Sequence, residues 1–221
     1  SGSAFAGTST SVTGLTAQTT YYLHVRSNCG GGNFSSWATS TAFTTPCAAI
    51  NTFPYTESFS AAMPNCWAAS EDYPGAYYHW APTTADGSNG AAAPQAGTHF
   101  MFLYVYLASS SYNSYNLTTA SFDLGATPKF MSYYYFLGTS GYTSSPVPMT
   151  VKISTNGGST WTNLYQHDNN NSTFGAWTQN TIDLTAYANQ SVLIRFASNS
   201  NYGSGICNQG LDEFSIYDAP S

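Results

Sequence analysis

The sequence predicts an all-β protein, and three features lead to that class. Apolar side chains show no sustained period of 3.6 residues, which an amphipathic helix would need. Aromatic and β-branched residues instead form short alternating runs bounded by Gly, Pro, Asn and Ser. Only 6% of the 221 residues are charged, against roughly 25% in an average soluble domain. We therefore expect a neutral surface rich in hydroxyl and amide groups.

The alternating runs fall into two groups on either side of a predicted linker at residues 46–49. Three strand candidates precede the linker, at 8–13, 21–27 and 37–44. Eleven follow it, and that number of short strands indicates a two-sheet sandwich. They lie near 53–59, 66–70, 77–81, 99–108, 116–123, 129–136, 147–154, 162–167, 177–184, 191–197 and 212–217.

The first group resembles the second half of a fibronectin type III domain, which is an immunoglobulin-like sandwich. The segment 14–26, Gly-Leu-Thr-Ala-Gln-Thr-Thr-Tyr-Tyr-Leu-His-Val-Arg, places Leu15 six residues before Tyr21. In that family the tyrosine hydroxyl ties a corner back to the upstream backbone. Trp37 and the ending Thr-Ala-Phe-Thr-Thr at 41–45 resemble its final strand. An ordinary hairpin with a coincidental tyrosine is the alternative.

The second group resembles the jelly-roll β-sandwich modules of the MAM and cleaved-adhesin type. The order and spacing of several segments carry this resemblance, namely 54–59, 63–67, 97–103, 151–161, 194–196 and 211–216. The resemblance implies two domains, a partial fibronectin type III-like domain at 1–46 and a jelly-roll domain at 47–221. The same combination resembles large secreted surface proteins of Bacteroidota-like bacteria.

Charge and cysteine usage narrow the compartment and the partners. Four cations oppose ten carboxylates, so no basic patch exists for a nucleic-acid backbone. No apolar run approaches the ~18 residues needed to span a bilayer, and we expect no membrane insertion. The opening residues predict a mature or internal fragment. Four cysteines without a C-x-x-C pair favour disulfides in an oxidising, extracellular compartment over a zinc site.

The predicted hairpin of residues 21–44 separates two of the cysteines. Cys29 would lie at its turn and Cys47 beyond its far end, about 25 Å away at ~3.3 Å per residue. That exceeds the limit of ~7 Å between Cα atoms in a disulfide. MAM-like openings pair their first two cysteines, so the resemblance implies a Cys47–Cys66 bond. Cys29 and Cys207 would then pair together or with another chain.

The sequence gives no support for catalysis. The segment 138–141 lacks the spacing of a nucleophile elbow, and the ten carboxylates are scattered. Residues 154–161 match the S-x-D-x-G-x-T-W hairpin of sialidases with Asn156 in place of the Asp, but we interpret this as a structural turn. The four histidines are dispersed, and we expect each on a strand or loop surface.

The resemblance to MAM-like modules implies a structural calcium ion between the opening strand, a loop after the first tryptophan and the final strand. Glu57 and Asp212 match the motif positions, and Asp72 is placed by its order alone. Glu71, Asp86 and Glu213 are second choices. Calcium takes six to eight oxygen ligands from separate segments, although these acids could equally be solvated.

We therefore expect a non-catalytic extracellular adhesion or structural module that contacts neighbouring copies or other surface proteins. The alternative is a carbohydrate-binding accessory module of a secreted hydrolase or protease, because tyrosine-rich runs such as 133–136 could stack on sugars. The partial first domain would leave an apolar sheet face open. Upstream residues, the jelly roll or a neighbouring subunit could cover it. We favour a cover outside the chain, and completion by a neighbour could propagate a filament.

Overall fold

The computed structural model describes residues 4, 6–7, 9–71, 79–85, 90–104, 114–138, 148–168, 172–199 and 208–219. These residues form strands and one short 3-10 turn, η1 (Thr185–Tyr187), which confirms the all-β class. No helix in this part of the chain is long and apolar enough to cross a membrane. The chain divides into two compact units, Ser1–Ala48 and Ala49–Ser221.

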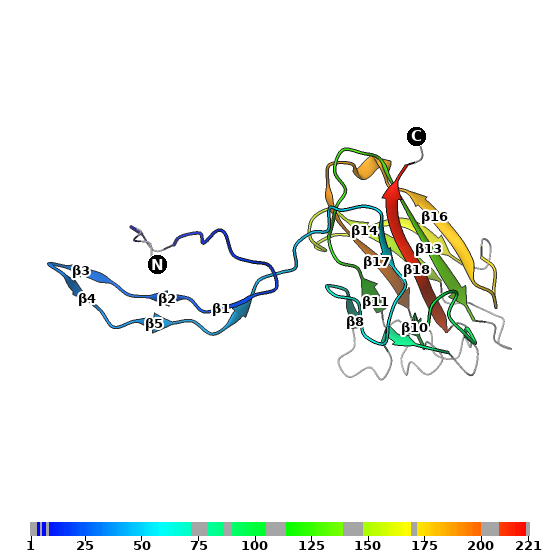
Figure 1. Ribbon diagram of the computed structural model, residues 1–221, viewed down its shortest axis with the longest axis horizontal. Helices are drawn as coiled ribbons and strands as arrows, with labels where there is room; N and C mark the ends of the chain where they lie inside the picture. The colour runs from blue at the N-terminus through cyan, green and yellow to red at the C-terminus, as the bar shows by residue number, and fades with distance from the viewer. Residues whose placement is uncertain are drawn as a thin grey trace. The chain divides into compact units, whose positions relative to one another are not determined.

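The first unit is a long two-stranded hairpin built from three short strand pairs (Figure 1). Along the hairpin, β1 pairs with β6, β2 with β5 and β3 with β4, all antiparallel. Their bounds are β1 (Thr20–Tyr21), β2 (His24–Val25), β3 (Asn28–Gly30), β4 (Asn33–Phe34), β5 (Ala38–Thr39) and β6 (Phe43–Thr44).

Two serines bridge the interruptions between these strand pairs. Ser40 Oγ accepts the Leu23 N–H at 3.0 Å, and Ser35 Oγ accepts the Ser27 N–H at 2.8 Å. Both serine N–H groups donate back to the carbonyls of the same partners. A side chain thus replaces a backbone carbonyl at each break, and the hairpin continues through both irregularities because no backbone donor there is left unpaired.

Tyr21 fixes the corner at the base of the hairpin. Its hydroxyl oxygen accepts the Thr16 N–H at 2.9 Å, and its ring lies 6.2 Å from that of Phe43. Further along, Leu23, Val25 and Trp37 are exposed. The tie from Tyr21 has the form that the fibronectin type III resemblance implies, while the rest of that domain and the cover over the apolar residues stay predictions.

The second unit is a sandwich of two antiparallel sheets (Figure 1). One sheet has the order β16-β13-β18-β10-β9, with β7 beside the far half of β18. Its strands are β7 (Tyr55–Glu57), β9 (Ala81–Thr83), β10 (Phe100–Leu103), β13 (Lys129–Leu137), β16 (Thr178–Asp183) and β18 (Gln209–Asp218).

The other sheet has the order β15-β14-β17-β11-β8, with β12 beside the first residues of β17. Its strands are β8 (Ala68–Glu71), β11 (Ser114–Thr118), β12 (Phe122–Asp123), β14 (Met149–Ser154), β15 (Thr162–His167) and β17 (Ser191–Asn199). Alternating apolar residues of both sheets meet in one core, which includes Met131, Val151, Ile194, Phe196, Phe214 and Ile216.

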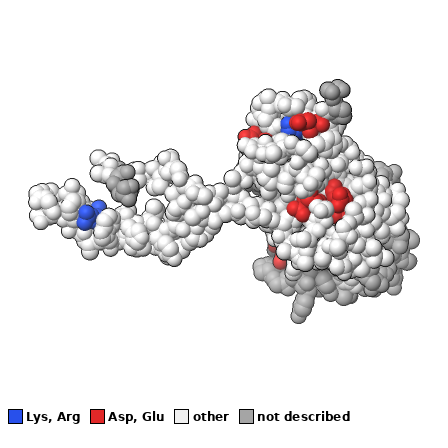
Figure 2. Space-filling model, viewed as in Figure 1, with Lys and Arg blue, Asp and Glu red and all other residues white. Residues whose placement is uncertain are grey.

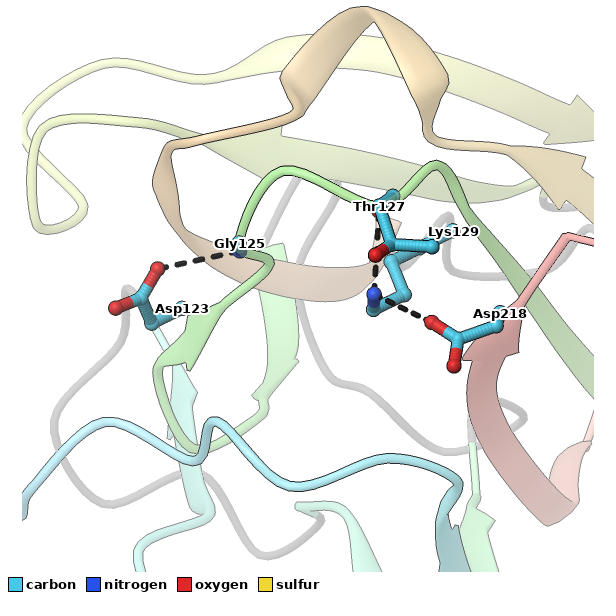
Figure 3. A network of polar contacts seen from close by, with 5 residues as sticks. All are labelled: Asp123, Gly125, Thr127, Lys129 and Asp218. Atoms are coloured by element: carbon cyan, nitrogen blue, oxygen red, sulfur yellow. Dashed lines mark hydrogen bonds and ion pairs between the residues drawn. The ribbon is translucent and has the colours of Figure 1, made fainter.

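A buried lysine fixes one end of β13 against the end of β18 (Figure 3). Lys129 Nζ forms an ion pair with Asp218 and donates to the Thr127 carbonyl at 3.1 Å. It also lies 4.9 Å from the centre of the Phe53 ring. Because the ammonium is paired and hydrogen-bonded, its burial is tolerated.

The described residues contain one disulfide. Cys47 and Cys66 are both disulfide-bonded, and Cys29 is free and exposed. The chain has four cysteines. If Cys47 or Cys66 were bonded to Cys207, the other would have no partner left, so Cys47 and Cys66 are bonded to each other. Cys207 lies outside the described residues, and its pairing with Cys29 or another chain stays a prediction.

Candidate functional site

A buried carboxylate lies at the centre of the most polar corner of the sandwich. Asp212 in β18 is 0% exposed, and its Oδ2 accepts the N–H groups of Gln95 at 2.8 Å and Ala96 at 3.3 Å. Its Oδ1 accepts the Glu213 N–H at 2.9 Å. Burial raises the pKa of Asp212 to about 6, although these three hydrogen bonds act to lower it. Asp212 thus anchors a loop 117 residues away in sequence.

Glu57 of the opening strand lies in the same corner. It pairs with Phe214, two residues beyond Asp212 on β18. Its Oε1 accepts the Phe59 N–H at 2.9 Å, and Phe59 has a positive φ of 54°. The loop anchored by Asp212 continues to Gly97, where an added Cβ would lie 3.7 Å from the Ser58 carbonyl oxygen. Three segments therefore meet at this corner.

Of the three predicted calcium ligands, Glu57 and Asp212 lie on the paired strands β7 and β18, with Glu57 opposite Phe214. Asp72 lies outside the described residues, and the calcium site stays a prediction. Of the second choices, Glu213 follows Asp212 in the corner, Glu71 ends β8 in the opposite sheet, and Asp86 is not described. The described residues contain no group of three or more His, Cys, Asp or Glu side chains that could hold a metal ion by themselves.

The donors in this corner nevertheless fit calcium chemically. Calcium takes oxygen ligands from carboxylates and backbone carbonyls together. Each carboxylate offers about four lone-pair positions, and Asp212 uses three of them for N–H donors. Burial raises the pKa of the Asp212 carboxyl, and a cation beside Glu57 and Asp212 would lower that pKa.

A second buried polar group joins the two sheets at the opposite edge. His167 of β15 is 1% exposed, so the expectation that it lies on the surface is wrong. Its Nε2 lies 2.7 Å from the Tyr133 hydroxyl, which accepts an N–H from Asn180 at 2.8 Å. The Tyr133 hydroxyl and Nε2 share one further hydrogen bond, in which the imidazole tautomer decides the donor.

The environment of His167 is aromatic. The ring centres of Tyr135 and Tyr165 lie 3.8 and 4.8 Å from that of His167, and Nδ1 has no hydrogen-bond partner. Burial lowers the pKa of His167 to about 4, and the nearby Asp168 acts in the opposite direction. A histidine this inaccessible cannot reach a substrate, so we assign it to the core.

The hairpin at residues 154–161 is a structural turn, as the sequence predicts. Asn156 Oδ1 accepts the Thr160 N–H at 2.9 Å, and Ser154 Oγ accepts the Gly158 N–H at 2.9 Å. Trp161 Nε1 donates to the Gly158 carbonyl at 3.0 Å. The side chains of Ser154, Asn156 and Trp161 are thus bonded to the backbone of their own hairpin.

Aromatic side chains on the outer face of the β18 sheet pack against one another instead of forming an open platform. Phe100, Phe136 and Trp177 form a small second cluster. Trp177 Nε1 donates to the Ala93 carbonyl at 2.9 Å. Its ring lies directly over Gly210, where an added Cβ would approach Trp177 Cη2 to 2.8 Å. Within β13, Tyr133 and Tyr135 point into the core.

Charged groups are few and scattered on the visible surface. On the sandwich unit, Figure 2 shows one compact group of acidic atoms and one basic group beside acidic atoms, on an otherwise uncharged face. Lys152 and Arg195, which no sequence motif marks, stand opposite one another on neighbouring strands of the other sheet. Their proximity depends on the pairing register of β14 and β17, which cannot be read from the sequence.

No protein-family model matches this sequence, and no curated protein matches it. Solved structures do match its fold. The K3 cleaved adhesin domain of Lys-gingipain from Porphyromonas gingivalis is 17% identical, with a TM-score of 0.55 over 75% of this chain and 98% of that one. The K1 domain of the same protein is 19% identical, with a TM-score of 0.53 over 76% of this chain and 100% of that one.

A carbohydrate-binding module from the β-sandwich superfamily, described as promiscuous in specificity, is also similar. It is 12% identical, with a TM-score of 0.51 over 90% of this chain and 74% of that one. At these identities the likeness shows the fold alone. The second unit, Ala49–Ser221, therefore has a β-sandwich fold of the jelly-roll kind that these adhesin and carbohydrate-binding modules also have.

Proposed function

We propose that this chain is a non-catalytic, extracellular adhesion module of a larger surface protein. One observation carries the proposal: the polar groups that most resemble catalytic ones are committed to the fold. Asp212 is buried and bonded to three backbone N–H groups, His167 is closed in by aromatic rings, and Ser154 holds a turn. Catalysis requires such groups within reach of a substrate.

An oxidising location outside the cell is supported by the disulfide of Cys47 and Cys66, since such bonds persist in secreted proteins. The fold likeness to cleaved adhesin domains supports the same location. A secreted surface protein that carries part of a fibronectin type III domain before the sandwich would present this module away from the cell.

A structural calcium ion is part of this proposal. Glu57 and Asp212 would hold it, and it would link the opening strand to the final strand. The ion would stabilise the native state by mass action because it would bind the folded chain and not the unfolded one. It would supply no catalytic chemistry.

The alternative is a carbohydrate-binding accessory module, which the likeness to a carbohydrate-binding module favours. Both versions are tested by one experiment on the purified chain. Soluble and insoluble polysaccharides and bacterial cell surfaces are incubated with it, and retention and product release are measured together. We expect saturable retention on at least one of these surfaces without release of reducing sugar or peptide. Product release above the blank that is lost in Asp212→Asn would overturn the proposal.

A further inference from the structure

The outer face of the β15-β14-β17-β11-β8 sheet carries two rows of side chains that cross all five strands. In one row, consecutive strands contribute Asn163, Lys152, Arg195, Thr118 and Ala68, each opposite the next. In the adjacent row they contribute Gln166, Thr150, Ala197, Asn116 and Ser70. We call these residues the cationic row and the amide row.

Both rows lie on the side of the sheet away from the core, although Ala197 and Asn116 of the amide row are themselves buried. The residues that alternate with them, such as Ile153, Ile194 and Leu117, are buried between the sheets, and successive side chains of a strand point to opposite faces. Strands lie about 4.8 Å apart, so each row spans roughly 19 Å from the first strand to the fifth. This length suits an extended polymer better than a single small molecule.

The two cations at the centre of the cationic row have an arrangement that the fold does not require. Lys152 and Arg195 are directly opposite one another, and like charges in that position cost stability. The chain has only four cations. Of the other two, Lys129 pairs with Asp218, and Arg26 lies in the first unit, 3.9 Å from the Phe34 ring centre.

Arg195 is held in place before any ligand arrives. Its Nε donates to Thr118 Oγ1 at 3.0 Å, and its guanidinium carbon lies 3.9 Å from the centre of the Trp161 ring. Lys152 forms no ion pair with any residue that the structure describes. A fixed guanidinium beside an available ammonium is a suitable receptor for a carboxylate.

The flanking groups define the rest of the ligand. Neither row contains a carboxylate, and the nearest acids along the strands are Glu71, which alternates to the inner side after Ser70, and Asp168, beyond the end of β15. Asn163, Gln166 and Thr150 offer amide and hydroxyl groups on one side of the cations. A sugar polymer with carboxylates matches both kinds of group.

We propose that this face binds an acidic polysaccharide, whose uronate carboxylates contact Lys152 and Arg195 and whose hydroxyls contact the neighbouring amide and hydroxyl side chains. This inference rests on the proposed function as a binding module and names its ligand class. A nucleic acid, with one charge per about 1.7 Å of duplex, would need many more cations than two, and the chain has a net charge of -6.

The test uses polygalacturonate and, as a matched neutral ligand, the same polymer with its carboxylates methyl-esterified. Binding to the whole chain is measured by calorimetry at pH 7 in low and high salt. We expect polygalacturonate to bind, high salt to weaken it, and the methyl ester to bind at least tenfold more weakly. Chondroitin sulfate shows whether a sulfated polymer also binds. A preference for it over polygalacturonate would overturn the uronate assignment.

Matched variants locate the site. Lys152→Gln should weaken polygalacturonate binding roughly tenfold, as expected for the loss of one charge-assisted contact, and K152Q/R195Q should abolish it. Arg26→Gln removes the same charge from the other unit and should leave binding unchanged. If the double variant fails to fold, Lys152→Gln alone still decides the matter.

Equal binding by Lys152→Gln and the wild type, or equal binding of the two polymers, would overturn the inference. If the chain binds neutral polysaccharides or cells but no acidic polymer, the proposed function as a binding module stands and the acidic ligand class is wrong. Release of sugars from polygalacturonate would instead contradict the non-catalytic function.

Discussion

Acid should destabilise the sandwich through His167, and the size of the effect follows from its burial. The imidazole is 1% exposed, and its pKa falls from 6.5 to about 4 because burial penalises the charged form. The unfolded chain therefore binds a proton in a pH range where the native chain does not. Stability from this group is present above pH 6.5 and is lost as the pH falls towards 4.

The shift of 2.5 pKa units between 6.5 and about 4 corresponds to about 3 kcal/mol at 1.36 kcal/mol per unit. Asp212 acts with the opposite sign. Its pKa is raised from 3.8 to about 6, so its contribution is present below pH 3.8 and is lost as the pH rises through 6. In the wild type the two slopes largely offset one another between pH 4 and 6.

A single variant separates the two groups. Gln at position 167 keeps an acceptor for the Tyr133 hydroxyl but cannot take up a proton, whereas Asp212 is unchanged. We expect the difference in unfolding free energy between wild type and His167→Gln, from urea titrations, to decrease by about 3 kcal/mol from pH 7 to pH 4. A difference that stays constant across this range would refute the argument. If the variant does not fold, the titration of the His167 ring protons by NMR in the wild type gives the pKa directly.

Three further predictions concern the sandwich. Gly210→Ala should lower the unfolding free energy by about 1–3 kcal/mol, because the new methyl group would overlap the Trp177 ring at 2.8 Å; urea titration measures this, and an unchanged midpoint would contradict the close approach. Chelation of calcium should lower the melting temperature of the wild type but not of Glu57→Gln. At a calcium concentration of 100 times its Kd, the ion would raise the unfolding free energy by about 2.7 kcal/mol. Equal melting temperatures of the wild type with and without chelator would contradict the site. Peptide mapping without reduction should find Cys47 linked to Cys66, and a Cys29–Cys47 link would contradict the hairpin geometry.

The alternation of apolar and polar residues predicted the bounds of the central strands closely, because one face of each strand must be apolar to pack in the core. The expected strands at 129–136 and 162–167 correspond to β13 (Lys129–Leu137) and β15 (Thr162–His167). Where the pattern is weak the prediction was wrong. Residues 9–13 form no strand, and the expected strand at 116–123 is two strands, separated where Thr119 bonds to the Ile194 backbone through both its N–H and its Oγ1.

The candidate site was predicted by resemblance and not by pattern. Glu57 and Asp212 lie on the paired strands β7 and β18, and their role as calcium ligands stays a prediction. Nothing in the sequence shows that Asp212 is bonded to residues 95 and 96. The same limit applies to Lys152 and Arg195, whose opposition depends on the pairing register of β14 and β17. A composition of 6% charged residues gives the number of cations but not the face on which they gather.

The final strand, β18, connects the opening strand β7, the loop at residues 95–96 and the start of β13. β18 lies between β13 and β10, and its second half pairs with β7 at the opening of the sandwich. Asp212 in its middle anchors the loop before β10, and Asp218 at its end pairs with Lys129. Without β18, Glu57 has no strand partner and the loop at 95–96 has no anchor. The Glu57–Asp212 corner therefore forms only in the completed sandwich. This is the condition under which a calcium ion held there would stabilise the native state alone.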